Sequence, residues 1–229
     1  MRERFDKLMP LPPLKLAGSL TETVFAEEQR SDPFTGVRWP RSTLRAFRNP
    51  LPHRHGFDIR PAKTPHQHVA ASMLVQRMYA WRGYKTESLT LRPDDPYRIT
   101  LAAWQSDTII ATLTLRRDSP HGLLADALYA REIERLRCPS RILCEVSRLA
   151  VAPDFSTREL LARLFQAALE YARNIFVASD AVIEVNPRHA PYYQHQLGFL
   201  PLGEPRHCQR VGAPAVLLHQ TLNSIAIRV

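Results

Sequence analysis

Residues 144–151 read CEVSRLAV, and Ala152-Pro153-Asp154 then lead into an amphipathic helix. This octapeptide is strand-like and mostly apolar, yet it contains a carboxylate, Glu145, and a guanidinium, Arg148. Burying an ionised side chain without a partner is costly, so two such groups in a core strand need an explanation. One explanation is structural, in which the two groups pair with each other or with neighbours. The other is that the strand borders a substrate cleft, where Glu145 accepts a proton.

Size and composition limit the class of protein. The chain has 229 residues, 45% of them hydrophobic, and no uninterrupted apolar run approaches about 18 residues. No charged leader precedes an apolar stretch. We therefore expect a soluble, cytoplasmic protein with one good-sized core and no integral membrane segment. The cysteines at positions 138, 144 and 208 lack metal-ligand spacing, and we expect reduced thiols, with Cys144 and Cys208 in the core.

The net charge of +9 is carried mostly by arginine, since the chain has only four lysines. Such a field favours acidic partners, among which nucleic acid, an anionic membrane surface and an acidic carrier protein all qualify. The arginines are scattered and no RNP-like motif is present, which weighs against nucleic acid and leaves peripheral membrane contact open. The pairs His53/His55 and His66/His68 lack an acidic or thiol companion at useful spacing, so we expect no metal site.

Two regions differ in their pattern. Residues 1–56 are interrupted by prolines, with arginines between them, and this composition predicts a flexible N-terminal arm. Residues 57–229 have the periodicity of a globular domain. Hydrophobic spacing and capping signals predict an alternation of strands and helices: a strand from Phe57, a helix from Pro65 to Gly83, strands 97–104 and 108–115, a helix over 123–136, a strand over 141–151, a helix over 157–176, a strand over 181–185, a helix over 191–196 and a strand over 215–222. This order predicts an α/β fold, a mixed sheet with helices on both faces.

Several segments of the sequence resemble those of a known protein family. Residues 186–199 read NPRHAPYYQHQLGF after the fifth long strand, and this combination resembles the GCN5-related N-acyltransferase (GNAT) superfamily. More narrowly, four segments look like the long-chain N-acyl amino acid synthases and the related acyl-homoserine-lactone synthases; they are residues 71–84, 111–118, 122–129 and 145–151. The resemblance spans about residues 57–222. It implies a GNAT-like fold and an acyl transfer to an amine.

One departure from the superfamily concerns the acyl donor. Most relatives that use acetyl-CoA have a glycine-containing loop after the fourth strand, whose backbone amides wrap the pyrophosphate. Here residues 154–161 read DFSTRELL, without glycine. A helix N-terminus with Ser156, Thr157 and Arg158 would still hold one phosphate diester, as in the phosphopantetheine of an acyl carrier protein. The simpler alternative is that Ser156 or Thr157 only caps the helix. No tightly bound cofactor is expected, and acyl-CoA stays open as a donor.

A second departure concerns the acceptor. Acyl-homoserine-lactone synthases carry an arginine near the end of their third strand, where this chain has Thr114, and their early acidic pair is not evident here. This difference favours an amino acid, or another small amine, as the acceptor.

Chemistry and the resemblance together suggest the site residues. A thioester reacts with a neutral amine, so a base must remove a proton, and Glu145 is our candidate. Strand alternation places Glu145, Ser147 and Leu149 on one face and Arg148 on the other. A β-bulge would bring Arg148 round, where it would bind the acceptor's carboxylate. Glu184 is either a second base or a paired structural carboxylate.

The resemblance implies further roles. Tyr193, or alternatively Tyr192, stands where relatives have a general acid for the leaving thiolate. The backbone amides of Leu149, Ala150 and Val151 would polarise the thioester carbonyl. The remaining expected substrate contacts are Ser147 and Asn186. The expected acyl-chain walls are Leu113, Leu115, Val146 and Leu149, with the alternative that these apolar strand residues only form the core.

The sequence thus predicts an N-acyltransferase that moves a long-chain acyl group from an acyl carrier protein to an amino acid. Two alternatives stay open. One is an acyl-CoA-dependent transferase acting on another small amine. The other is a catalytically silent member of the fold that binds a carrier protein or nucleic acid.

Overall fold

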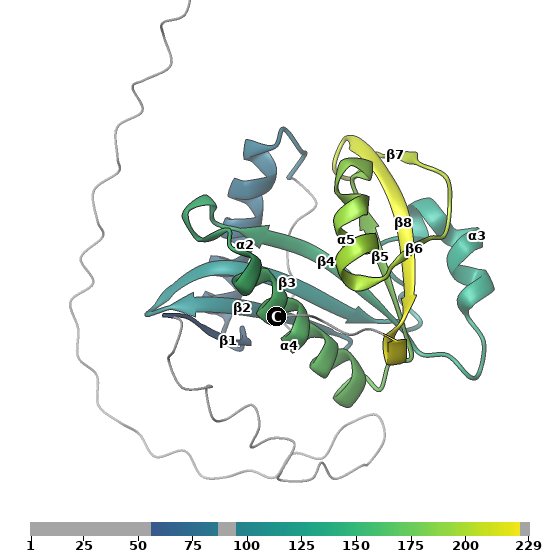
Figure 1. The fold of residues 1–229 in the computed structure, drawn as a ribbon, viewed down its shortest axis with the longest axis horizontal. Helices are drawn as coiled ribbons and strands as arrows, with labels where there is room; N and C mark the ends of the chain where they lie inside the picture. Colours follow the sequence, from purple (N-terminus) through teal and green to yellow (C-terminus); the bar gives the residue numbers. More distant parts are fainter. Residues whose placement is uncertain (1–55, 87–94, 225–229) are drawn as a thin grey trace, which may run out of the picture. The chain divides into compact units, whose positions relative to one another are not determined.

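The computed structural model describes residues 56–86 and 95–224 (Figure 1). The arm predicted over residues 1–56 therefore lies, except for Gly56, outside the described residues. Within the described ranges the chain forms one mixed sheet with helices, and the predicted α/β class is confirmed.

The sheet has eight strands in the order β1-β2-β3-β4-β5-β8-β6, with β7 paired to β8. Neighbouring strands are antiparallel except for β4 and β5, which are parallel. Their bounds are β1 Asp58–Pro61, β2 Arg98–Gln105, β3 Thr108–Arg117, β4 Leu143–Val151, β5 Asp180–Val185, β6 Leu200–Pro201, β7 Arg206–Cys208 and β8 Ala213–Thr221. The predicted strands 97–104 and 108–115 are confirmed as β2 and β3, which pair as an antiparallel hairpin. The predicted strand positions include neither β6 nor β7, because two or three residues are too few to show a period.

Helices cover both faces of the sheet, as predicted. α2 (Pro65–Trp81) begins with the expected capping box, in which Thr64 and Gln67 exchange side-chain and backbone hydrogen bonds. α2 and α3 (Asp126–Leu136) pack on one face, whereas α4 (Arg158–Asn174) and α5 (Ala190–Leu197) pack on the other. This separation gives each long strand one face toward α2 and α3 and one toward α4 and α5.

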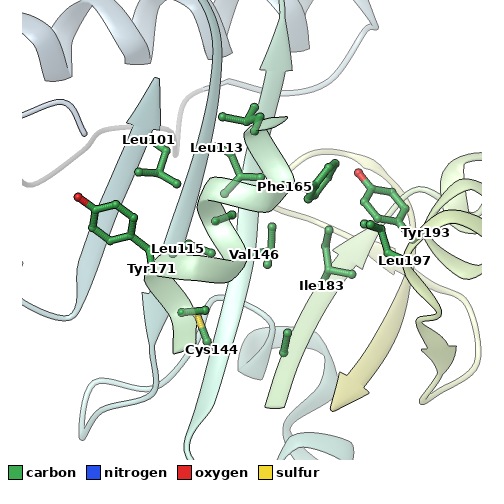
Figure 2. Close-up of a cluster of buried hydrophobic side chains, with 14 of the residues drawn as sticks. Leu101, Leu113, Leu115, Cys144, Val146, Phe165, Tyr171, Ile183, Tyr193 and Leu197 are labelled. Carbon is green, nitrogen blue, oxygen red and sulfur yellow. The ribbon is translucent and has the colours of Figure 1, made fainter. Parts of the chain in front are cut away.

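The largest cluster of buried side chains lies between the sheet and the α4–α5 layer (Figure 2). Leu113 and Leu115 of β3 contribute fully buried side chains, and Phe165 of α4 meets Tyr193 of α5 edge to face at 6.0 Å between ring centroids. Cys144 and Cys208 are both buried free thiols, so their predicted place in the core is confirmed, whereas Cys138 is exposed.

β4, which contains residues 144–151, has two irregularities. The first is in its pairing with β3. Thr112 of β3 pairs with Ala150, but Thr114 pairs with Ser147, so two β4 residues, Arg148 and Leu149, stand opposite one β3 residue. Arg148 has φ 53°, a left-handed conformation that a bulge accommodates. The expected β-bulge is therefore confirmed.

The second irregularity is a split in the sheet. β4 and β5 pair from Leu143 and Asp180 only as far as Val146 and Ile183, although β4 continues to Val151. Beyond that point the two strands run apart (Figure 1). Beyond this point, the backbone N–H and C=O groups on the facing edges of β4 and β5 no longer pair with each other.

Candidate active site

A cavity of about 590 Å³ opens where β4 and β5 separate. β4 and β5 supply its floor, α2 and the turn after it one wall, α5 a second wall, and the β7–β8 loop a third. Polar and aromatic groups from these elements line it: Tyr79, Trp81, Arg82, Tyr84, Glu145, Ser147, Arg148, Ser156, Glu184, Asn186, His189, Tyr192, Tyr193 and Arg210. The cavity thus gathers residues that are up to 136 positions apart in the chain (Tyr79 to Ala215).

Glu145 lies at the inner end of this cavity and is 1% exposed. Its carboxylate accepts the backbone N–H of Leu124 at 2.6 Å and that of Ala125 at 3.0 Å. Burial raises the pKa of Glu145 to about 7, against the opposing effects of the Leu124 amide and Arg210. A carboxyl with that pKa exchanges protons near neutral pH, which suits a general base. The same hydrogen bonds also make Glu145 an anchor for the turn before α3.

Arg148 reaches the face of the sheet that carries Glu145, because the bulge turns it there. Leu149, by contrast, packs with the α4–α5 core. The prediction that Leu149 lies on the same face as Glu145 is therefore wrong, because the bulge interrupts the alternation of side chains. Burial lowers the pKa of Arg148 to about 10, with the Arg98 guanidinium as a further cause, and the residue still carries a positive charge at neutral pH. A half-buried cation in a cavity is suited to an anionic ligand group.

Glu184 and Arg210 form a second charged pair in the cavity wall. Arg210 donates from Nη2 to Oε1 of Glu184 at 2.9 Å, and the Glu184 side chain is only 7% exposed. This contact fits the structural alternative for Glu184. Arg210 also influences Glu145, since its charge opposes the rise in that carboxyl's pKa.

Tyr193 and Tyr192 project from α5 and both line the cavity. Tyr193 is buried among Phe165, Tyr192 and Phe199, and burial raises its pKa. Its phenol therefore stays protonated at neutral pH, as a proton donor must. Tyr192 is more exposed and lies nearer the rim.

Most of the other predicted contact residues lie at the cavity. Ser147, Leu149, Val151, Ser156 and Asn186 line the cavity; Ser147 Oγ is buried without a hydrogen-bond partner among the described residues. Ala152 donates its N–H to Ile110 of β3, and N–H groups alternate sides along a strand, so that of Val151 points toward the split.

The structure does not bring the remaining predicted residues to the cavity. Ala150 packs its side chain against α2. Thr157 accepts the N–H of Leu160 and caps α4, as the simpler alternative expected, and Arg158 is exposed in the first turn of that helix. Asn186 has a local role as well, since its side chain accepts the N–H of Arg188.

A separate apolar slot lies next to the cavity, between the sheet and the α4–α5 layer. It has a volume of about 30 Å³ and is lined by Leu115, Cys144, Val146, Phe165, Ala168, Leu169, Ala172, Ala181, Ile183, Leu197, Phe199 and Leu222. Val146 and Ile183, the last paired residues of β4 and β5, border both spaces. Leu115 thus lines an apolar pocket as expected, whereas Leu113 is a core residue that touches neither space.

Sequence reasoning overlooked several residues of the cavity, among them Arg210 and Tyr79. Arg210 lies in the loop between β7 and β8. The sequence does not single it out, because loops have no hydrophobic period. Tyr79 lies within the predicted helix from Pro65 to Gly83, and its position in that helix gives no sign of a role in the site. In the structure it lines the cavity, and burial raises its pKa.

Comparison with known proteins matches this geometry to a family. The family model described as N-acyl amino acid synthase FeeM matches residues 70–221. The chain belongs to this N-acyl amino acid synthase family. The solved structure of FeeM, from uncultured soil microbes, is 25% identical over 77% of this chain and 95% of FeeM, with a TM-score of 0.69. No curated protein sequence matched this chain.

More distant structures share the fold of the FeeM family. A putative N-acetyltransferase from Lactobacillus plantarum is 18% identical, with a TM-score of 0.54, over 73% of this chain and 99% of its own. The AHL synthase LasI is 12% identical, with a TM-score of 0.52, over 76% of this chain and 96% of its own. The GNAT-like fold and the FeeM family make this chain an acyltransferase that acts on an amine.

Proposed function

We propose that this acyltransferase moves a long-chain fatty acyl group from the thioester of an acyl carrier protein to the amine of an amino acid. The observation that carries the proposal is the split between β4 and β5, where a cavity lined by charged groups borders an apolar slot beneath α4. An amphiphilic product, an apolar chain linked to a carboxylate, matches these two environments.

The charged cavity accommodates the amino acid. Its carboxylate binds the guanidinium of Arg148, and Ser147, whose Oγ has no partner among the described residues, hydrogen-bonds the same molecule. Glu145, with a pKa of about 7, takes the proton of the ammonium group, and the free amine attacks the thioester carbonyl. The C–N bond forms first and gives a tetrahedral intermediate, and the C–S bond breaks when this intermediate collapses to the amide. The nitrogen then loses its second proton, which restores the Tyr193 phenol after that phenol has protonated the thiolate, and Glu145 releases its proton to solvent.

The thioester lies across the split. The backbone N–H of Val151 points toward it and stabilises the negative charge on the carbonyl oxygen in the tetrahedral intermediate. Tyr193 donates a proton to the departing thiolate, which is why a neutral phenol is useful there. The acyl chain begins beside Val146 and Leu115, and the slot, which has a volume of only about 30 Å³, must widen between the sheet and α4 to hold a long chain.

The residues of the turn before α4 bear on the choice of acyl donor. Ser156 borders the cavity, while the Thr157 hydroxyl is occupied by the helix cap. Without glycine in residues 154–161, the backbone lacks the close approach that a coenzyme A pyrophosphate requires. One phosphate diester at this helix N-terminus, near Arg158, is the simpler fit. This supports the carrier protein as donor, with acyl-CoA as the alternative.

The direct test combines the purified protein with palmitoyl carrier protein or palmitoyl-CoA and a mixture of amino acids, followed by mass spectrometry. We expect an N-acyl amino acid with the carrier-bound donor, and none from a Glu145→Gln, Arg148→Ala double variant. Product formed only from the CoA thioester would replace the donor assignment. No product from either donor, with folded protein, would reject the proposed activity.

A further inference from the structure

The outward face of α2 exposes large apolar side chains. Val69, Met73 and Trp81 are 57%, 63% and 70% exposed, and the described residues expose only three others of this kind, Val177, Tyr192 and Leu200. Val69 and Met73 are four residues apart and therefore lie on the same side of the helix. Trp81 ends the helix. Exposed groups of this size on one helix normally meet an apolar partner.

The same region is strongly basic. Residues 59–86 contain five arginines and lysines and no aspartate or glutamate. Arg77 is exposed beside the apolar side chains, and the Arg82 guanidinium lies 5.4 Å from the centroid of the Trp81 ring. Apolar side chains flanked by cations, with a tryptophan at the border, are typical of a helix that lies on an anionic lipid surface.

This face continues into the entrance of the site. Trp81 and Arg82 line the cavity between β4 and β5, and Trp81 also borders a groove of about 410 Å³ with Ile109, Pro153 and Phe155. Trp81 therefore connects the exposed side chains of α2 with the cavity mouth and with this groove, whose lining also includes Arg77 and Asp154. No helix within residues 56–86 and 95–224 is long and apolar enough to cross a membrane, so contact with lipid would be peripheral.

We propose that the outer face of α2, formed by Val69, Met73, Arg77 and Trp81 together with Arg82 just after the helix, docks the enzyme on an anionic lipid surface. The apolar side chains enter the interfacial region and the guanidinium groups meet lipid phosphates. Lipid fits better than an acidic protein, because charge attraction alone gives no reason to expose three large apolar groups. The docked orientation places the cavity mouth at the lipid, where an amphiphilic product would leave the enzyme. The docking itself needs no substrate and is independent of the proposed donor and acceptor.

The test is co-sedimentation of the full chain with vesicles of phosphatidylcholine alone or with about one third phosphatidylglycerol. We expect binding to the anionic vesicles that weakens with added salt. Met73→Gln and Trp81→Gln should each lower the partition constant about threefold to tenfold. Arg77→Gln should lower it about fivefold on anionic vesicles only. Leu200→Gln and Arg131→Gln are matched controls, exposed on β6 and α3, and should bind like the parent.

Each other result overturns the proposal. Absence of binding to anionic vesicles, or α2 variants that bind like the controls, means that this face does not meet lipid. If the same variants instead raise the KM for acyl carrier protein and leave that for acyl-CoA unchanged, the face is a protein-docking surface. Lower thermal stability of Met73→Gln and Trp81→Gln, without a change in vesicle binding, means that the chain itself covers these side chains.

Discussion

Glu145, near the start of β4, accepts the backbone N–H of Leu124 at 2.6 Å and so connects the cavity to the turn before α3. The carboxylate has both its oxygens in hydrogen bonds, because Ala125 donates to the second one. One buried group therefore has two consequences that can be measured separately, on stability and on catalysis.

The first prediction concerns stability. Because burial raises the pKa of Glu145 from 4.5 to about 7, the folded protein binds more protons than the unfolded chain between these values. The Glu145 contribution to the free energy of unfolding is thus most favourable below pH ~4.5, decreases by roughly 3 kcal/mol as the pH rises to about 7, and is constant above that. Urea unfolding across this range should show the decrease in the parent and not in Glu145→Gln. Parallel profiles would contradict the shift.

The second prediction concerns turnover. If Glu145 takes the proton of the amine, kcat should increase as the pH rises through about 7, and Glu145→Gln should lower kcat by ~10²-fold or more. Glu134→Gln, at an exposed position on α3, is the control and should retain parental kcat. A folded Glu145→Gln protein with full activity would remove Glu145 from the mechanism and leave it as an anchor for the turn before α3.

The third prediction separates the charge of Arg148 from its backbone. Arg148→Ala and Arg148→Gly should both raise the KM for the amino acid about tenfold or more, with little change in the KM for the acyl donor. Glycine tolerates φ 53°, so the glycine variant should have the higher free energy of unfolding, by about 1 kcal/mol. Steady-state kinetics and urea unfolding measure the two effects. An unchanged KM for the amino acid would show that another group binds its carboxylate.

The fourth prediction concerns Tyr193. Tyr193→Phe should lower kcat by ~10- to 10²-fold with the natural alkyl thioester, because the thiolate then leaves without a proton. The loss should shrink with an aryl thioester, whose thiolate is a better leaving group. Tyr192→Phe, at the rim, is the control. Equal losses with both thioesters would indicate a packing role among Phe165 and Phe199.

The fifth prediction concerns the apolar slot. Ala168→Leu on α4 should fill part of it and shift the products toward shorter acyl chains, at a cost of about 1–3 kcal/mol in stability. Ala167→Leu, on the same helix but outside the slot, should keep the parental chain lengths. Mass spectrometry of the products gives the distribution. The same distribution for both variants would place the acyl chain elsewhere.

Local patterns were sufficient for most of the fold. The capping box at Thr64, the alternation of β2 and β3 and the apolar stripe of α4 are short-range signals, and each element formed where it was expected. Glu145, Arg148 and Tyr193 were also recognisable, because a charge in an apolar strand and a motif after the fifth strand can be read along the chain.

Contacts between distant segments were decided only by the tertiary structure. The sequence by itself determined the elements, their order and the residues able to do the chemistry, since propensity and hydrophobic period act over a few neighbours. It did not determine that Leu124 would anchor Glu145, that Arg210 would pair with Glu184, or that Leu113 would stay in the core while Leu115 lines the slot. These depend on strand register, on the bulge at Arg148 and on where β4 leaves β5, which are set by packing across the whole sheet.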